Sequence, residues 1–146
     1  MAETLRPDIC VIGGGPGGLS VAMAAAALGV PTVLVEGHKM GGDSLNTGSV
    51  PSKALLAAAR RAEATRTARM FGVEGRDTRV NFPDVHRHVH ATIATAARDD
   101  SAERLTGLGV RVVHAQAKFK DRNTVAAGDT DIRARRFVIA TGSKPA

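Results

Sequence analysis

The chain has 146 residues, enough for one domain with a buried core. Hydrophobic residues make up 43% and charged residues 23%, as in an ordinary soluble globular protein, and the formal net charge is +6. The basic residues are spread over several segments, and the chain contains no Trp, no Tyr and only four Phe. These features argue against a stacking surface for single-stranded nucleic acid, so we expect no nucleic-acid partner.

The sequence also shows neither a membrane segment nor a secretory signal. The longest apolar stretch, Leu19 to Val35, is interrupted by Gly29 and Pro31. The N-terminal stretch from Met1 to Asp8 is polar and charged. We therefore expect a cytoplasmic protein without a membrane partner, in which the one cysteine, Cys10, is a buried small hydrophobic residue.

The first 36 residues are predicted to form a strand, a glycine-rich turn, a helix and a second strand. The apolar runs Ile9–Ile12 and Thr32–Val35 are typical of buried strands, and the alanine-rich stretch Leu19–Leu28 is typical of a helix. Pro16 suits the first turn of that helix, because its missing N–H would have no intrahelical partner there. This order is the opening of a Rossmann-like, doubly wound parallel sheet in an α/β fold.

The rest of the chain is predicted to contain two more helices and several short strands. One helix is expected from Ser52 to about Met70, and another from about Asn81 until Gly107 and Gly109 end it. Apolar residues recur every three or four positions in the second helix, which indicates a buried face. The remaining elements are parallel-sheet strands at 110–113 and 137–140 and, between them, a small antiparallel β-meander with turns at 121–123 and 128–131.

Three glycines, Gly13, Gly15 and Gly18, form the pattern G-x-G-x-x-G between the first strand and the first helix. They permit, in order, a tight turn, close approach of the backbone to a pyrophosphate, and close packing of the helix on the sheet. The helix N-terminus adds N–H groups that can bind the phosphates. Glu36, at the end of the second strand, can accept hydrogen bonds from both ribose hydroxyls and would repel a 2′-phosphate. The pattern predicts a dinucleotide site unsuited to NADP, without separating NAD from FAD.

A second motif follows the second strand. The stretch from Gly41 to Lys53 reads G-G-D-S-L-N-T-G-S-V-P-S-K. It resembles the redox motif of the dihydrolipoamide dehydrogenase, glutathione reductase and mercuric reductase family, G-G-x-C-x-N-x-G-C-x-P-S-K, except that Ser44 and Ser49 stand at the two cysteine positions. Segments 115–119 and 140–145 are similar to the family's adenine-contacting turn and to its A-T-G-S-x-P strand end.

The resemblance implies the FAD-binding segment of a flavin-dependent pyridine nucleotide–disulfide oxidoreductase. In such an enzyme, hydride passes from NAD(P)H to FAD, and electrons then pass to a cysteine pair, here Ser44 and Ser49, and on to a disulfide substrate. The resemblance also implies that Lys53 lies near the flavin N5 edge. The implied catalytic positions are therefore Ser44, Ser49 and Lys53. The implied cofactor-binding residues are Gly13, Gly15, Pro16, Gly18, Glu36, Gly42, Asp43, Ser49, Lys53, Ala117, Thr141 and Gly142.

The two serines cannot form a disulfide, so the chain as it stands is expected to perform no dithiol chemistry. Two explanations remain open: a Cys-to-Ser replacement in an intact motif, or a natural homologue that passes electrons from flavin to a quinone, oxygen or another protein. Residues five apart in a regular helix have Cα atoms about 8.7 Å apart, whereas a disulfide needs less than about 7 Å. Position 44 is therefore expected in a distorted or pre-helical turn, with Pro51 disrupting regular helix just beyond.

The family's enzymes are longer, so the resemblance implies that residues 1–146 form an incomplete FAD-binding domain, inactive alone, without the NAD-binding and dimerisation domains. The full-length protein is expected to be a homodimer. The alternative function is a non-catalytic module that binds FAD, NAD or a protein partner. His86 and His90 share a helix face, but their neighbours Val85 and Val89 resemble core residues, so we expect no metal site.

Overall fold

A computed structural model of the chain describes residues 3–74 and 79–143. Its central element is a four-stranded parallel sheet with the strand order β4-β3-β2-β8. Every residue of β3 is buried, and so are three of the four residues of β2, as the apolar runs predicted. The strands are β2 (Ile9–Ile12), β3 (Thr32–Glu36), β4 (Arg111–His114) and β8 (Arg136–Ile139).

A second four-stranded sheet has the order β1-β7-β6-β5. The strands β5 (Ala117–Asp121), β6 (Thr124–Ala127) and β7 (Thr130–Arg133) are antiparallel and form the expected meander. A short strand that the sequence did not indicate, β1 (Glu3–Leu5), pairs in parallel with β7. The segment is too short and polar to show an apolar strand pattern. Its strand conformation depends on backbone hydrogen bonds to a distant segment, which the sequence does not reveal.

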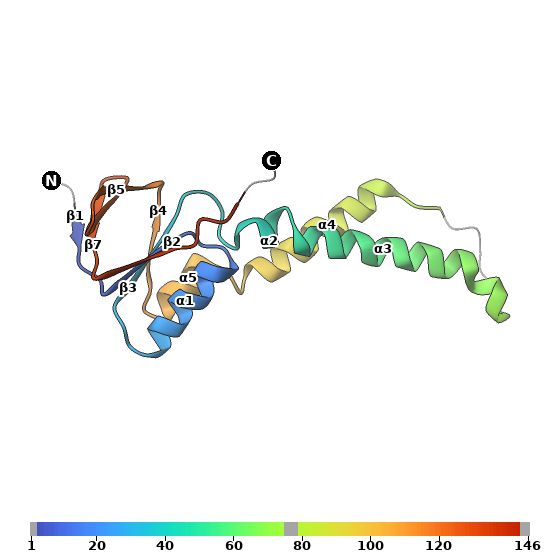
Figure 1. The fold of residues 1–146 in the computed structure, drawn as a ribbon. Coiled ribbons are helices and arrows are strands. Elements are labelled where there is room, and N and C mark those ends of the chain that lie inside the picture. The colour runs from blue at the N-terminus through green and yellow to red at the C-terminus, as the bar shows by residue number, and fades with distance from the viewer. Residues whose placement is uncertain (1–2, 75–78, 144–146) are drawn as a thin grey trace.

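The parallel sheet is covered on both faces (Figure 1). On one face, Val11 and Leu34 pack against Leu19 of α1 (Pro16–Ala27) and Leu105 of α5 (Ala102–Gly107). On the other face, side chains of β2 and β3 form a core with residues of the second sheet, among them Ile132. The Rossmann-like α/β fold is confirmed, with the small second sheet as the layer opposite the helices.

The remaining helices form an arm. A short helix, α2 (Gly42–Asn46), leads into α3 (Ser49–Thr67), which ends in a 3-10 turn, η1 (Ala68–Phe71). After residues outside the described ranges, α4 (Phe82–Ala97) packs along α3, and the pair extends away from the two sheets (Figure 1). In the described part of the chain, no helix is long and apolar enough to span a membrane.

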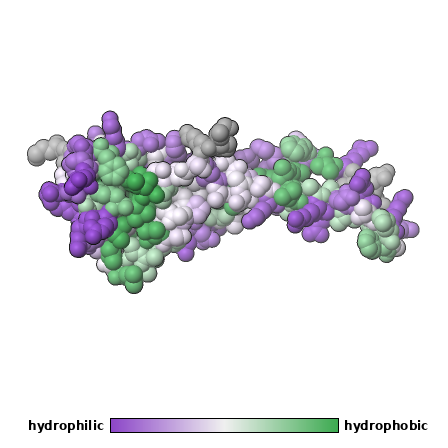
Figure 2. Space-filling model, viewed as in Figure 1, coloured by the Kyte–Doolittle hydropathy of each residue, from purple (hydrophilic) through white to green (hydrophobic). Residues whose placement is uncertain are grey.

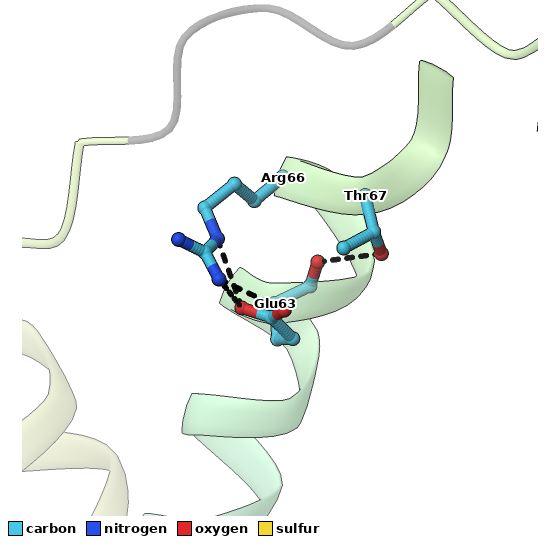
Figure 3. Close-up of polar contacts among 3 residues, drawn as sticks. All are labelled: Glu63, Arg66 and Thr67. Carbon is cyan, nitrogen blue, oxygen red and sulfur yellow. Dashed lines mark hydrogen bonds and ion pairs between the residues drawn. The ribbon is translucent and has the colours of Figure 1, made fainter. Parts of the chain in front are cut away.

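The arm carries an exposed apolar groove of about 390 Å³. Figure 2 shows hydrophobic surface on this part of the molecule, and Phe82 is 63% exposed. At the rim, Arg66 donates two hydrogen bonds of 3.0 Å to the carboxylate of Glu63, which lower the pKa of Glu63 (Figure 3). The groove is lined by Leu55, Ala58, Ala59, Ala62, Glu63, Arg66, Val80, Phe82 and Val85.

Three sequence-based expectations about the helices were wrong. The helix expected to run to Gly107 divides into α4 and α5, because the Ser101 hydroxyl accepts a hydrogen bond from the Arg104 N–H and caps a new helix. No residue of α4 is fully buried, because its apolar side faces the slender α3 and not a sheet. Pro51 does not disrupt α3, since it lies in the first turn, where an N–H has no intrahelical partner.

Cys10 is fully buried in β2, as expected. Burial raises the pKa of its thiol to about 11. Lys144 and Pro145, the last positions of the strand-end motif, lie outside the described residues.

Candidate functional site

The turn between β2 and α1 needs glycine at two positions of its G-x-G-x-x-G pattern. Gly13 has a φ of +110°, and a Cβ there would overlap the carbonyl group of Ala140. A Cβ on Gly18 would overlap the carbonyl oxygen of Gly13 and lie 3.2 Å from Cγ1 of Val11. The first glycine therefore allows the turn and the third allows α1 to lie against the sheet, as the sequence predicted.

The space beside Gly15 remains open. A Cβ there would meet only the Cα of Gly42, at 3.8 Å. Gly15 is the N-cap of α1, Pro16 follows it, and the first turn contains no acidic residue. The first N–H groups of a helix have no intrahelical acceptor and lie at its positive end, so this opening suits the phosphates of a dinucleotide.

The carboxylate of Glu36 is held by two backbone N–H groups at the end of β3. Gly14 donates to Oε2 at 2.5 Å, and His38 donates to Oε1 at 2.7 Å. The residue is 9% exposed. A carboxylate oxygen can accept more than one hydrogen bond, so both oxygens retain capacity for ribose hydroxyls. The two backbone donors fix the carboxylate beside the glycine turn.

The loop that carries the second motif comes back onto the glycine turn. The Gly41 N–H donates to the Gly14 carbonyl at 2.8 Å, and a Cβ on Gly42 would lie 2.9 Å from the Cα of Gly15. Asn46 donates from Nδ2 to the carbonyls of Met40 at 3.0 Å and Gly42 at 2.8 Å. Sequence reasoning gave Asn46 no role, although its place as a fixed residue of the motif was an available signal.

Two further segments reach the same edge of the parallel sheet. After β8, the Ala140 N–H donates to the Ile12 carbonyl at 2.8 Å, which brings the exposed Thr141 beside Gly13 of the glycine turn. Gly142 follows it and is exposed. After β4, the Ala115 N–H donates to the Glu36 carbonyl at 3.0 Å. Ala117, two residues later, begins β5.

Two side chains at the Glu36 end of the site were not identified from the sequence. Nε2 of Gln116 lies 3.4 Å from the Gly37 carbonyl and 3.3 Å from Nε2 of His38. The Gln116 side chain also occupies the space that a Cβ on Gly37 would need. Gln116 lies in the segment 115–119 that resembles the adenine-contacting turn, which was an available signal, whereas His38 belongs to no motif and only the tertiary structure brings it beside Gln116.

The two serine positions lie on different helices. Ser44 is half-buried in α2, and Ser49 is the exposed first residue of α3. Between them, the N–H groups of Thr47 and Gly48 both donate to the Asp43 carbonyl, at 3.0 and 2.6 Å, and end α2. The expectation that position 44 lies in a distorted or pre-helical turn was therefore wrong, because Ser44 is inside α2; regular helix is instead interrupted at Thr47 and Gly48, between the two serines. Asp43 is exposed in the first turn of α2, next to Gly42.

Lys53 lies one turn beyond Ser49 and is exposed on α3, the helix that leads into the arm. The structure thus gathers the glycine turn, Glu36, the Gly41–Gly42 loop and the segments after β4 and β8 at one edge of the sheet. Ser49 and Lys53 lie in the first two turns of α3, which follows the loop and α2.

Residues 7–146 match the family model described as pyridine nucleotide-disulphide oxidoreductase. The chain therefore belongs to this oxidoreductase family. It is 36% identical to a dihydrolipoyl dehydrogenase of Pseudomonas aeruginosa, over 99% of this chain and 32% of the relative. It is 32% identical to the enzyme of the same name from Geobacillus stearothermophilus and 35% identical to that of Bacillus subtilis, in both cases over 97% of this chain and 31% of the relative. The chain spans about a third of the length of these relatives.

Proposed function

We propose that this chain is the FAD-binding segment of a flavoprotein NAD(P)H-dependent disulfide oxidoreductase. The observation that carries the proposal is the contact between its two motifs. The loop Gly41–Gly42 rests on the glycine turn through the 2.8 Å hydrogen bond to Gly14 and the close approach to Gly15. A motif that resembles a redox centre thereby begins at the opening suited to a pyrophosphate.

Each part of the site has a proposed task toward FAD. The backbone of Gly13, Gly15 and Gly18, with Pro16 at the helix start, would hold the pyrophosphate, and Glu36 would accept from the ribose hydroxyls. Further proposed contacts come from Gly42, Asp43, Ser49, Lys53, Ala117, Thr141 and Gly142. When bound, the flavin would supply two-electron chemistry between a nicotinamide and the next acceptor.

Ser44 and Ser49 limit the chemistry of this chain. A hydroxyl forms no disulfide, and the one thiol, Cys10, is fully buried in a strand with its pKa raised to about 11. We propose that Ser44 and Ser49 stand at the positions of a redox cysteine pair, that Lys53 would stabilise negative charge on a reduced flavin, and that the chain alone is inactive.

The same observation favours a second candidate, a non-catalytic module that binds FAD or NAD or docks a partner. In either case, we propose that residues 1–146 are an incomplete domain of a longer cytoplasmic homodimer. The longer oxidoreductase would take NAD(P)H and a small-molecule or protein disulfide as partners.

The first test is to mix the purified chain with FAD, to desalt it and to record its visible absorption spectrum. Retained flavin absorbance, lost in Glu36→Ala, supports the FAD site. A colourless protein that nevertheless retains NAD contradicts FAD as the ligand. The matched control is Glu63→Ala, which removes a carboxylate on the arm and is expected to leave retention unchanged.

The second test restores cysteine at both serine positions in the longer protein. The proposal of a disulfide oxidoreductase expects NAD(P)H-dependent disulfide reduction in Ser44→Cys/Ser49→Cys and none in either single variant. A double variant that binds FAD and reduces no disulfide would instead support the non-catalytic module.

A further inference from the structure

Helix α4 carries a pair of histidines whose ring nitrogens lie close together. His86 and His90 are four residues apart, so their side chains share one face of the helix. Their Nε2 atoms are 3.1 Å apart, while their ring centroids are 4.3 Å apart. The Nε2 atoms therefore lie on the edges at which the two rings approach each other. Both side chains are exposed, so the pair is accessible to a ligand from solvent.

The separation of the two nitrogens fits a shared metal ion. Metal–imidazole bonds are about 2.0–2.1 Å long, so a cation bonded to two Nε2 atoms 3.1 Å apart would subtend an N–metal–N angle of about 98°. This angle lies between the roughly 90° of square-planar or octahedral coordination and the roughly 109° of tetrahedral coordination. Both Nε2 atoms would have to be unprotonated, so the cation would replace the N–H···N hydrogen bond that the 3.1 Å distance otherwise allows.

We propose that His86 and His90 form a chelating site for a late first-row divalent cation, which Cu²⁺ would occupy most tightly. Imidazole is a preferred ligand of copper, nickel and zinc, and affinity for a given nitrogen site rises to a maximum at Cu²⁺. The pair is separate from the residues proposed for the flavin site, because none of those residues lies on α4 (Phe82–Ala97).

The neighbouring charges are compatible with a cation. Arg87, which lies between the two histidines in sequence, forms an ion pair with the carboxylate of Asp84. This pairing reduces the repulsion that the guanidinium would exert on a metal ion. In residues 3–74 and 79–143, no group of three or more His, Cys, Asp or Glu side chains could hold a metal. Solvent would therefore fill the remaining coordination positions.

The sequence alone favoured no metal site, because the residues beside the histidines resembled a core. In the structure, Val85 and Val89 of α4 are half-buried, while His86 and His90 are exposed. Helical spacing allowed the two rings to meet, but only the side-chain arrangement brings their nitrogens to a chelating distance.

The test is a titration of the purified chain with CuCl₂ at neutral pH, with glycine present as a weak competing chelator. We expect one tight site per chain and, by pulsed electron paramagnetic resonance, two coordinated imidazoles. His86→Ala and His90→Ala should each weaken binding about tenfold or more, because the second ligand would no longer bind intramolecularly. Each variant should also leave one coordinated imidazole.

His88 provides a matched control on the same helix. It lies two residues from each member of the pair, about 200° around the helix, and is exposed. His88→Ala should change the Cu²⁺ affinity less than about twofold, since it leaves the chelate intact. Circular dichroism of all variants verifies that they fold alike. An equal affinity of the unaltered chain and the His86→Ala/His90→Ala variant would overturn the proposal, as would an equal loss in His88→Ala.

Discussion

Gly17 and Gly18 are adjacent in the first turn of α1, and their replacement by alanine should change stability in opposite directions. A Cβ on Gly17 meets no atom within 4 Å, and the residue does not have a positive φ. Alanine loses less backbone entropy than glycine when a helix forms. Gly17→Ala should therefore raise the free energy of unfolding by up to about 1 kcal/mol.

A Cβ on Gly18 has no such space. It would overlap the carbonyl oxygen of Gly13 and lie 3.2 Å from the Val11 side chain. Neither group can move freely, because the Gly13 N–H donates to the Val35 carbonyl at 2.8 Å and Val11 is fully buried. The helix would have to move away from the sheet, so Gly18→Ala should lower the free energy of unfolding by about 1–3 kcal/mol.

Equilibrium unfolding in urea, followed by far-ultraviolet circular dichroism, measures both changes. The two midpoints should move in opposite directions with similar slopes, which would indicate that a similar surface is exposed on unfolding. Flavin retention should also survive in Gly17→Ala and fall in Gly18→Ala. If Gly18→Ala were as stable as Gly17→Ala, the close contact of α1 with the glycine turn would be refuted.

Two further predictions concern single side chains. Glu36→Gln should lower the free energy of unfolding in urea by about 1–3 kcal/mol, because the amide nitrogen cannot accept a hydrogen bond and one of the two backbone donors loses its partner. The control Glu63→Gln, on the exposed arm, should have little effect. Equal losses of stability in the two variants would contradict this reasoning. The pKa of the Cys10 thiol is raised from 9.0 to about 11, so the folded chain keeps a proton that the unfolded chain releases. The contribution of this thiol to the free energy of unfolding should thus be fully present below about pH 9 and fall by up to about 3 kcal/mol as the pH rises to about 11. Cys10→Ala should reduce this decline, and a variant with the same pH profile as the unaltered chain would refute the reasoning.

Much of the geometry of the candidate site could be predicted from the sequence because its signals are local. The run Ile9–Ile12 has no polar side chain, so it predicted a strand buried on both faces. Gly13 and Gly18 stand where an added Cβ would collide with backbone, so their spacing reports the geometry of one turn. Glu36 ends the next strand, and the carboxyl ends of neighbouring parallel strands lie at one edge of a sheet.

The motif from Gly41 to Lys53 indicated the protein family directly, since its residues are contiguous in the sequence. It could not show how Asn46 holds the loop, because the acceptors of its two hydrogen bonds are backbone carbonyls. Every residue type has such a carbonyl, so the sequence does not indicate which ones accept. The ends of α4 and α5 were missed for a similar reason. The apolar pattern continues past the point at which Ser101 caps a new helix.

By itself, the sequence determined the order of the strands and helices around the glycine turn, the family to which the chain belongs and the absence of thiols at positions 44 and 49. Only the tertiary structure decided that β1 joins β7, that the arm leaves its apolar groove exposed and that the nitrogens of His86 and His90 lie 3.1 Å apart. The physical reason is that propensity, periodicity and motif spacing act over a few neighbouring residues. Sheet pairing, burial and side-chain geometry instead depend on which distant segments come into contact when the chain folds.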